Sequence, residues 1–554
     1  MRNHEAARIL ANIAGMLEIK GDNPYKIRAY RIAAEAIINL DEDLAILKEK
    51  DRLSEIPGVG KAVKAKIEEL LEKGSLEYYE RLSAEVPPGL MEMLRIPGLG
   101  PKSVKVIFDN TGISSLDELL KAAQDKKIRN LPGLGAKTED IVINGIETMQ
   151  QDRGKETRGL AWPAAQDLLH FLLDCGAVIK ADIVGSLRRG KPLVSDIDIL
   201  AASRKPENIY EALLNYNKLD DVIYESKDHI QGHLFNGMEF EIIIVEPELY
   251  YPALTWTTGS KVHREIIFKD IKAESLLDVK SENDVYKHLG MSYIDPELRE
   301  NRGEIEMAHE GRLPELVKFT DIKGDLHNHT NWSDGVNKIE EMAAQAESLG
   351  YEYLAVTDHS KSLNISKGLD EARLAQQSQT IDNINNQNKI TILKGTEVDI
   401  LKNGQLDFND DILQELDIVV ASVHSYFKLD KEEQTDRIIT AIKNPHVDII
   451  AHLSGRLLKR RPAYELDIEK ILDAAANNQT VLEINAHPDR LDIDEEIAKQ
   501  AKDLGIKIAV NSDAHHLREL NNMHYGITSA RRSWLEASDI INTYPLEDLL
   551  DYLG

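Results

Sequence analysis

The chain has 554 residues, 42% of them hydrophobic and 29% charged, which is typical of globular proteins and excludes collagen-like, disordered and membrane-embedded classes. At about 150 residues per domain, three or four domains are expected. The single cysteine, Cys175, excludes an internal disulfide and favours a reducing, cytoplasmic location. Residues 9–17 are expected to form a buried helix face rather than a signal peptide, and no apolar run approaches the roughly 20 residues of a membrane span.

The net charge of −28 is unevenly distributed along the chain. Residues 1–150 hold 22 basic and 24 acidic side chains, a net of −2, so the remaining residues carry −26. A nearly neutral N-terminal region can still present a basic face to phosphates, whereas the acidic remainder suits carboxylate-rich metal sites.

Three short glycine motifs recur at residues 56–60, 96–100 and 131–135. Each has the core Pro-Gly-x-Gly and precedes a lysine-containing segment with helical periodicity, which predicts helix, tight turn, helix. Glycine permits positive φ, and the amides of the turn and the next helix can then point at one phosphate oxygen without reading a base. The predicted DNA-binding residues are Gly58, Gly60, Lys61, Lys66, Gly98, Gly100, Lys102, Gly133 and Gly135.

One such motif could be an ordinary helical hairpin, but three copies resemble helix-hairpin-helix DNA-binding motifs. The third copy fits least well, because acidic Glu139 and Asp140 follow its lysine. Polar residues 151–160 are expected to form a boundary, and a second boundary is expected near residues 311–323.

The middle of the chain combines an apolar helical pattern with strand-like runs at 196–202 and 239–246. Asp196 and Asp198 stand two apart on one strand and therefore share a face. Adjacent carboxylates repel unless a divalent ion lies between them, as Mg²⁺ does when it is bound to a nucleoside triphosphate. The motif G-S-x-R-R at 185–189 suits a helix N-terminus that cradles phosphates, with Arg189 supplying charge. The two features together predict a nucleotidyl-transfer site.

From residue 323 onward, seven β-rich and mostly apolar runs recur, most of them separated by helical patterns. Continuous apolar runs suit strands buried on both faces of a parallel sheet. Seven such units predict a barrel-like α/β domain with its chemistry at the C-terminal strand ends. The runs span residues 323–327, 353–358, 390–397, 417–423, 447–451, 481–485 and 507–511.

Nine histidine and acidic residues lie at these strand ends. Imidazole and carboxylate are the ligands expected for Zn, Mn or Fe, and nine of them would hold two or three ions able to activate a water and stabilise a phosphoester displacement. His446, His487, His516 and His524 lack this placement and are left outside the site. The predicted ligands are His327, His329, Asp334, His359, Glu397, His424, His452, Asp513 and His515.

The motifs HNH, TDH, GTE, SVH, AHLSGR and NSDAH follow in this order and resemble the PHP (polymerase and histidinol phosphatase) domain. The resemblance implies that the nine residues form a trinuclear site. Leu453 departs from the proline usual in relatives. Arg456 and Arg490 could hold a substrate phosphate bidentately or form salt bridges to barrel carboxylates.

G-S-x-R-R, Asp196-Ile197-Asp198 and the T-G-S-K segment at 258–261 resemble the palm and thumb of family X DNA polymerases, the polymerase beta relatives. With the PHP domain attached, nearly the whole chain resembles the bacterial family X polymerases (PolX). The implied domains are a helical 5′-phosphate-binding-like domain at 1–80, a fingers-like helical region at 81–158, an α+β nucleotidyltransferase palm at 159–245, a thumb at 246–315 and a seven-stranded α/β barrel-like PHP domain at 316–554.

The resemblance also assigns the palm site, with Mg²⁺ or Mn²⁺ as its cofactor. It implies Asp196, Asp198 and Glu241 as catalytic carboxylates, and Gly185, Ser186, Arg189, Trp256, Thr257 and Gly259 as nucleotide-binding residues. Lys66 matches the Schiff-base lysine of the beta-type lyase, with a plain phosphate contact as the alternative.

Two departures from the family pattern bear on polymerisation. The third catalytic carboxylate of the family is usually an aspartate, and the side chain of Glu241 is longer by roughly 1.5 Å. A catalytic group misplaced by about 1 Å can lower the rate on the order of 10²-fold, so weaker polymerisation is expected. Glu239 on the same strand face competes for this assignment. Trp256-Thr257 replaces the Tyr-Phe pair that abuts the sugar, so weaker discrimination against ribose is expected.

Three hypotheses follow for the function. The first is a gap-filling DNA repair polymerase whose PHP domain is a metal-dependent 3′–5′ exonuclease, with abasic-site cleavage or 3′-phosphate removal as further activities. The second keeps the nuclease and reduces the polymerase part to a DNA-binding platform. The third, a phosphoesterase unrelated to nucleic acid, is disfavoured by the three hairpin motifs. The expected partners are gapped or nicked DNA with a 5′-phosphate and dNTPs, with no membrane, and the protein is expected to be a monomer.

Overall fold

The computed structural model describes residues 3–38, 40, 44–94, 96, 98–151, 154–269, 271, 273–277, 279–363, 366–386 and 390–554. Pro97 of the second glycine motif and residues 152–153 of the expected boundary lie outside the described residues. The chain divides into two compact units, Met1–Arg153 with Lys459–Pro462 and Gly154–Leu458 with Ala463–Gly554. None of the described helices is long and apolar enough to cross a membrane.

The described part of the first unit is helical. Residues 9–17 lie on its first helix and bury Leu10, Ile13 and Leu17, which confirms the predicted apolar helix face. Their core partners include Ile67 and Leu70 of the fourth helix. The helices are α1 (Asn3–Lys20), α2 (Pro24–Ile38), α3 (Leu44–Glu49), α4 (Lys61–Lys73), α5 (Glu77–Glu85), α6 (Pro88–Met93), α7 (Pro101–Thr111), α8 (Leu116–Gln124) and α9 (Ala136–Gln151).

Each glycine motif joins two helical segments, as predicted. The turns connect the 3₁₀ segment Leu53–Glu55 to α4, α6 to α7, and the 3₁₀ segment Ile128–Asn130 to α9. The first glycine of each pair has positive φ: 79° at Gly58, 83° at Gly98 and 73° at Gly133. At Gly58 a Cβ atom would lie 2.6 Å from the backbone nitrogen of Ala33, so only glycine lets this turn approach α2.

The second unit begins with the predicted α+β region. Its five-stranded sheet has the order β2-β4-β7-β6-β5, in which β4 and β7 are parallel and the other neighbours antiparallel. The strands are β2 (Lys180–Ile183), β4 (Asp196–Ala202), β5 (Leu219–Glu225), β6 (His229–Leu234) and β7 (Glu239–Val245), with a small pair β1 (Glu156–Thr157) and β3 (Leu193–Val194) beside them.

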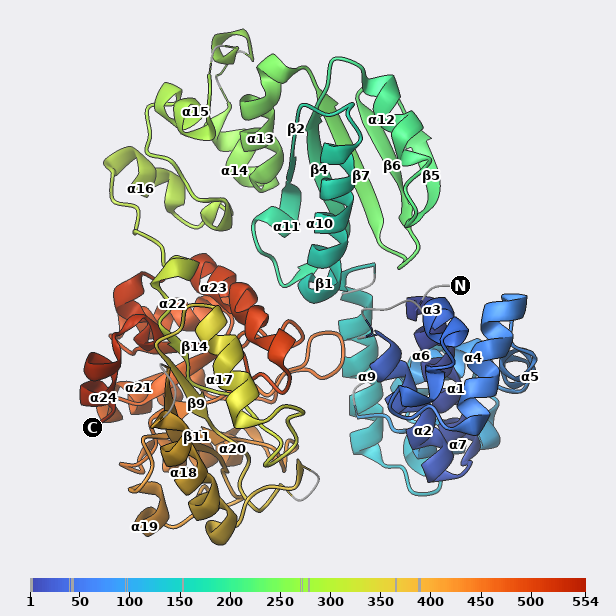
Figure 1. Ribbon diagram of the computed structural model, residues 1–554, viewed down its shortest axis with the longest axis vertical. Helices are drawn as coiled ribbons and strands as arrows, with labels where there is room; N and C mark the ends of the chain where they lie inside the picture. Colours follow the sequence, from blue (N-terminus) through green and yellow to red (C-terminus); the bar gives the residue numbers. More distant parts are fainter. Residues whose placement is uncertain are drawn as a thin grey trace. The chain divides into compact units, whose positions relative to one another are not determined.

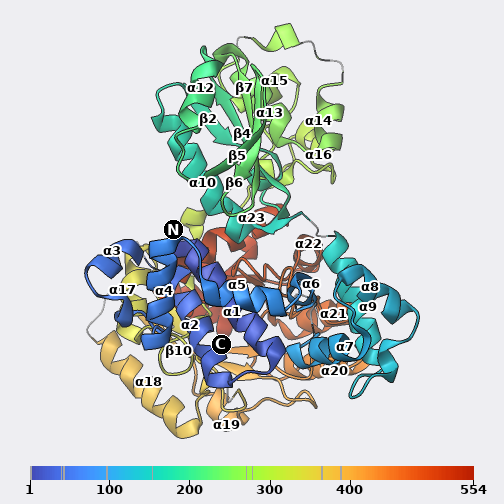
Figure 2. The ribbon, with the colours of Figure 1, turned by 90° about the vertical axis from the view of Figure 1, so that its right-hand side faces the viewer.

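Alternation along β4 divides the sheet into two faces. Ile197, Ile199 and Ala201 pack under helices α10 (Arg158–Asp174) and α12 (Pro206–Leu213), whereas Leu200 and Ala202 pack against α13 (Tyr250–Thr258) on the opposite face (Figures 1 and 2). Asp196 and Asp198 have the parity of Leu200 and therefore share the α13 face. The short helix α11 (Gly185–Arg188) follows β2.

The helices after β7 form a smaller layer with its own core. Ile267, Tyr286, Ile294, Leu298 and Ile305 are buried there. Its helices are α13, α14 (Lys261–Ile267), α15 (Glu282–His288) and α16 (Glu304–Glu310).

The C-terminal part is the predicted α/β barrel. Seven parallel strands run in the order β14-β13-β12-β11-β10-β9-β8, and a bridge from Asn328 to Ala514 links the two ends of the sheet, so the barrel is nearly closed. Every predicted run coincides with one strand, and β10 extends two residues beyond its run. The strands are β8 (Gly324–Asp325), β9 (Tyr353–Val356), β10 (Thr391–Asp399), β11 (Ile418–Ser422), β12 (Ile449–Ile450), β13 (Val481–Asn485) and β14 (Ile508–Asn511).

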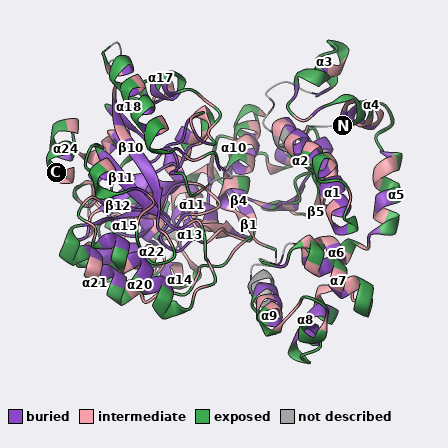
Figure 3. Ribbon diagram, turned by 90° about the horizontal axis from the view of Figure 1, so that it is seen from below, coloured by how far each residue is buried: buried purple, intermediate pink, exposed green. Residues whose placement is uncertain are grey.

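Helices surround these strands, which form the buried centre of the domain (Figure 3). The apolar character of the runs follows from burial on both sides of the sheet: Leu354 and Val356 face the outer helices, whereas Tyr353 and Ala355 face the barrel interior cluster. The helices are α17 (Ile339–Ser348), α18 (Glu371–Asn385), α19 (Asp410–Leu413), α20 (Lys431–Ile442), α21 (Ile468–Asn478), α22 (Glu495–Asp503), α23 (Met523–Arg532) and α24 (Leu546–Leu553).

Candidate active sites

The barrel brings all nine predicted ligands to one end of its parallel strands. Glu397 lies at the centre of the group. Its carboxylate oxygens are 2.7 Å from His359 Nδ1, 2.9 Å from His452 Nε2 and 3.3 Å from His424 Nε2. Asp513 Oδ1 lies 3.2 Å from His329 Nε2 and 3.7 Å from His327 Nε2.

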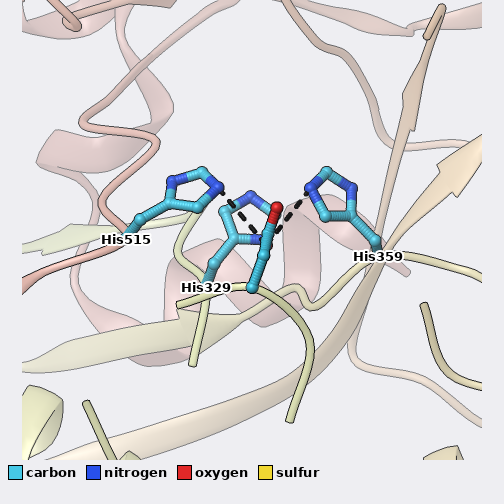
Figure 4. Close-up of side chains that lie close together, drawn as sticks. His329, His359 and His515 are labelled. Atoms are coloured by element: carbon cyan, nitrogen blue, oxygen red, sulfur yellow. Dashed lines mark ion pairs between the residues drawn. The ribbon is translucent and has the colours of Figure 1, made fainter. Parts of the chain in front are cut away.

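Asp334 completes the group at its more exposed side. Its carboxylate is 3.5 Å from His359 Nε2 and 3.4 Å from His515 Nε2, while His329 stacks against both of these rings (Figure 4). The donor atoms form three overlapping clusters, each compact enough for a cation. These clusters are His329, Asp334, His359 and His515; His327, His329 and Asp513; and His359, Glu397 and His424.

The donor set fits divalent metal ions. Several buried polar atoms of the cluster have no hydrogen-bond partner among the described residues, and two of them, Glu397 Oε2 and His359 Nδ1, lie only 2.7 Å apart. Such atoms are costly to bury unless an ion satisfies them. Neutral imidazoles and carboxylates are the usual ligands of Zn, Mn and Fe.

The pKa values of the cluster are set by the attraction between its imidazoles and its carboxylates. Burial disfavours the charged form of His327, but the carboxylates of Glu483, Glu397 and Asp513 outweigh it and raise the pKa of His327 well above its ordinary value. Burial would likewise raise the pKa of Glu397, but the imidazoles of His424, His359 and His327 hold it well below the ordinary range. The site therefore keeps its carboxylates ionised at neutral pH.

A set of buried carboxylates behind the ligands was not predicted from the sequence. Glu483 accepts a hydrogen bond from His327 Nδ1 at 2.7 Å and another from the backbone N–H of His452 at 2.9 Å. Asp399 contacts His424 Nδ1 at 2.9 Å. These contacts orient the imidazoles and select the tautomer that leaves the other nitrogen available for a metal. A signal was present for Glu483, which is a lone carboxylate inside an apolar strand.

The two arginines left open by the sequence have different roles. Arg456 donates a hydrogen bond from Nε to the carbonyl of Arg490, so its side chain stabilises the loop that contains Arg490. Arg490 is half-buried beside Asp513, with Nε 3.5 Å from the carboxylate, and its buried Nη1 has no hydrogen-bond partner among the described residues. Among the described residues, the three clusters contain none of His446, His487, His516 and His524, in agreement with their exclusion.

The second candidate site lies on the α13 face of the palm sheet. In the parallel register of β4 and β7, Asp196 is opposite Glu239 and Asp198 is opposite Glu241. Burial and the carboxylates of Asp196 and Glu241 raise the pKa of Asp198 to about 8. This arrangement fits a divalent cation, because carboxylates held so close together need a positive partner.

Glu241 and Glu239 are distinguished by their partners. Glu241 is ion-paired with His229 and receives a hydrogen bond from Gln231 Nε2 at 3.4 Å. Glu239 is exposed and lies 3.7 Å from His233 Nε2. The geometry favours Glu241 as the third carboxylate, because it lies beside the more deeply buried Asp198.

The glycine-serine turn lies directly above Asp198. Gly185 has φ 62° and begins α11, and a Cβ atom there would lie 1.8 Å from the Asp198 carboxylate, so glycine is required. The guanidinium of Arg189 is turned inward: Nε donates to Glu300 at 2.9 Å and Nη1 to the carbonyl of Thr258 at 2.9 Å. In this conformation Arg189 joins the palm to the thumb.

The remaining predicted nucleotide contacts lie at the end of α13 and on α11. Trp256 is 42% exposed, with the guanidinium of Arg264 5.3 Å from its ring centroid, and Thr257 donates from its hydroxyl to Ala253. Gly259 follows the helix in extended conformation, and Ser186 is half-buried on α11. Trp256 is therefore partly open to solvent at the end of α13, beside Arg264 and Phe268.

In the helical unit, the hairpin lysines are accessible. Lys61 and Lys102 are exposed at the starts of α4 and α7. Lys66 lies 4.7 Å from the centroid of the Tyr78 ring, and burial together with nearby Lys26 lowers its pKa. Of the two acidic residues that weaken the third motif, Glu139 is buried and accepts two hydrogen bonds from Arg129, whereas Asp140 is exposed.

Comparison with known proteins assigns these regions independently. Four family models match: a helix-hairpin-helix domain at residues 1–76, a SAM-like helix-hairpin-helix tandem at 90–148, a DNA polymerase beta thumb at 253–300 and a PHP domain at 325–487. The barrel strands and predicted ligands continue beyond the matched PHP segment, to Asp513 and His515.

The relatives found include one that covers the whole chain and others that cover 34–40% of it. The DNA polymerase/3′-5′ exonuclease PolX of Bacillus subtilis (strain 168) is 35% identical over 573 aligned positions, covering 100% of this chain and 99% of that protein. A probable phosphatase of Thermoanaerobacter sp. (strain X514) is 35% identical and covers 40% of this chain and 89% of its own length. A probable phosphatase of Acetivibrio thermocellus is 34% identical over 34% of this chain and 78% of its own length. The chain therefore belongs to the PolX family, the family X DNA polymerases that carry a C-terminal PHP domain.

Proposed function

We propose that this chain is a DNA repair enzyme with two divalent-metal sites, one that adds a nucleotide at a gap and one that shortens 3′ ends. The observation that carries the proposal is the convergence of nine imidazole and carboxylate side chains in the barrel, eight of them in compact donor clusters and His452 2.9 Å from Glu397. The expected substrates are gapped or nicked DNA with a 5′-phosphate and dNTPs, and the expected state is a cytoplasmic monomer.

The barrel residues would act on a phosphodiester. Two or three Mn²⁺, Zn²⁺ or Fe ions held there would supply an activated water and stabilise both oxygens of the displacement. Glu483 and Asp399 keep His327 and His424 oriented for this task. Arg490, half-buried beside Asp513 and with no hydrogen bond at Nη1 among the described residues, would bind a phosphate oxygen of the DNA strand or of a 3′-phosphate.

The palm residues would catalyse nucleotide addition. Mg²⁺ or Mn²⁺ would be held by Asp196, Asp198 and Glu241, where it stabilises the charge of the transferring phosphoryl group. The N–H groups of the turn at Gly185 and Ser186 would contact the triphosphate, and Trp256 would lie against the nucleotide. The carboxylate of Glu241 would accept the proton of the primer 3′-hydroxyl.

A second candidate function is a DNA end-processing nuclease whose palm serves only to hold DNA. The observation that favours it is Glu241, which replaces the shorter aspartate and is engaged by His229. A further proposal concerns Lys66, whose pKa is lowered by burial and Lys26, which favours the neutral amine that a Schiff base with an abasic sugar requires.

One gel tests both functions. A 5′-labelled primer is annealed next to a one-nucleotide gap with a 5′-phosphate and incubated with Mn²⁺, with and without dNTPs. Lengthening that Asp198→Ala abolishes supports the polymerase, and shortening that His359→Ala abolishes supports the barrel nuclease. Shortening alone supports the platform hypothesis, and cleavage that persists in His359→Ala would contradict the ligand assignment.

A further inference from the structure

The last turn of barrel helix α23 contacts the nucleotide-binding turn of the palm. Arg532 is 3% exposed and donates from Nη1 to the carbonyl oxygen of Arg189 at 2.6 Å. The same Nη1 lies 3.1 Å from Glu300 Oε1, and its Nε lies 2.5 Å from Glu495 Oε2 on α22. A barrel arginine thus joins the palm and thumb in one buried ion network.

The packing beside this network leaves little freedom. Gly190, which closes the palm turn, has φ 74°, and a Cβ atom there would lie 2.1 Å from Thr528 Cγ2 on α23. Arg158 at the start of α10 donates to the Thr528 hydroxyl at 2.9 Å. The turn that carries Arg188 and Arg189 is therefore seated directly on the barrel helix.

The network leads to the segment expected to contact the nucleotide. Arg189 donates to the Thr258 carbonyl at 2.9 Å, and Arg188 donates to the Thr258 hydroxyl at 2.6 Å. Thr258 follows Trp256 and Thr257 at the end of α13. Glu300, which orients Arg189, has its pKa lowered because Arg189 and Arg532 outweigh the effect of its burial.

We propose that Arg532 of the PHP domain is a positioning residue for the nucleotidyl-transfer site. It neutralises Glu300, anchors the carbonyl of Arg189 and so holds the Gly185–Arg189 turn and the Trp256–Gly259 segment in the geometry that binds a nucleotide. The inference rests on the proposed polymerase function and adds a dependence of the palm on the barrel, separate from the barrel's own chemistry.

Arg531 provides a matched control in the same helix. It is also partly buried at the junction, but it donates to Asp295 at 2.9 Å and Glu297 at 2.7 Å rather than to the palm turn. Removing either arginine weakens the attachment of the barrel by similar numbers of charged hydrogen bonds. Only Arg532 contacts Arg189, so a difference between the two variants reports positioning rather than docking.

The experiment measures nucleotide binding without turnover. The full chain is bound to a one-nucleotide gap whose primer ends in a dideoxynucleotide, and the concentration of correct dNTP that stabilises the ternary complex is determined by gel shift with Mg²⁺. We expect Arg532→Met to weaken dNTP binding about tenfold, the loss typical of one charge-assisted hydrogen bond. Arg532→Lys should restore part of the affinity, and Arg531→Met should stay within about twofold of the wild type.

Glu495→Gln is a milder second variant, because it loosens Arg532 from a partly exposed carboxylate without emptying the interface. It should weaken dNTP binding about threefold while leaving primer shortening unchanged. Equal dNTP affinity in wild type, Arg532→Met and Glu495→Gln would overturn the positioning role while the polymerase function stands. A wild-type chain that forms no dNTP-dependent complex would refute the nucleotide site itself, and the inference with it.

Discussion

Glu241 is the carboxylate of the proposed nucleotidyl-transfer site that departs from the family pattern. Its strand register places it opposite Asp198, but its side chain is one methylene longer than the aspartate of the family and is held by His229. We expect Glu241→Asp to increase the gap-filling rate by about tenfold or more, because a misplacement near 1 Å costs on the order of 10²-fold. Single-turnover extension of a gapped primer with Mg²⁺ measures this rate.

Glu239 supplies the control for this substitution. It lies on the same strand face, but it is exposed and near His233, two residues from the Asp198 register position. Glu239→Asp should leave extension unchanged. An increase in Glu239→Asp without one in Glu241→Asp would reverse the assignment of the third carboxylate.

Glu483 tests how far the barrel site depends on residues behind its ligands. It accepts hydrogen bonds from His327 and the backbone of His452 and contacts no substrate in the proposed mechanism. Glu483→Gln keeps the shape but removes the charge, so we expect Mn²⁺ affinity to fall about 10–100-fold. Titration of primer shortening with Mn²⁺ measures this, and extension in the palm should not change. An unaltered Mn²⁺ requirement would mean that packing alone orients His327.

Residues at strand ends could be predicted from the sequence, whereas their supporting contacts could not. His327 and Asp513 stand next to recognisable strands, and the C-terminal ends of parallel strands converge at one edge of a barrel. Glu483 is inside a strand, where only the folded register shows that it reaches His327. Arg189 was expected to contact a phosphate, but its guanidinium donates hydrogen bonds to Glu300 and to the carbonyl of Thr258. Because both partners are distant in the sequence, these hydrogen bonds could not be predicted from it.

At the scale of elements, the hairpin turns differ in how strictly they need glycine. Gly58 has positive φ, and a Cβ there would lie 2.6 Å from the Ala33 nitrogen and 2.8 Å from the Ala29 carbonyl. We expect Gly58→Ala to destabilise the protein by about 2–4 kcal/mol, because both backbone strain and a backbone clash oppose it. Thermal unfolding monitored by circular dichroism measures the change.

Gly133 in the third hairpin is the comparison. It has φ 73°, but none of the described residues beyond its two chain neighbours has an atom within 4 Å of an added Cβ, so Gly133→Ala should cost only the conformational strain of about 1–2 kcal/mol. Equal destabilisation by the two variants would show that the close approach of the first hairpin to α2 contributes nothing.

The elements themselves were largely predictable because their patterns are strong. Seven apolar runs gave seven parallel strands, although β8 and β12 have only two residues each in regular pairing. The Pro-Gly-x-Gly motifs gave three turns between helical segments. The alternation of side chains along β4 was enough to predict which face of the sheet carries the palm carboxylates. The packing of α23 against the palm could not be predicted, because it depends on side chains more than 300 residues apart.

For the whole molecule, the distribution of charge bears on how DNA is bound. The acidic net charge of −26 beyond residue 150 opposes DNA, so the nearly neutral helical unit must supply much of the attraction through locally exposed lysines. Lys61 and Lys102 are exposed at hairpin helix starts, where backbone N–H groups also point outward. Each phosphate contact releases a counterion, which makes binding weaken as salt rises.

We expect the loss of one such lysine to change the salt dependence of DNA binding measurably. Lys61→Ala should reduce the slope of log K against log salt for a gapped duplex by about one, uniformly across DNA sequences, because the lost contact is to phosphate and not to a base. Lys470, 61% exposed on barrel helix α21 and 3.6 Å from Asp467, is the control, and Lys470→Ala should leave the slope unchanged. Filter binding between about 50 and 200 mM salt covers the range in which such contacts dominate. If Lys470→Ala lowers the slope as much as Lys61→Ala does, the hairpins are not the principal contact with DNA, and the acidic unit must bind it through its metal sites.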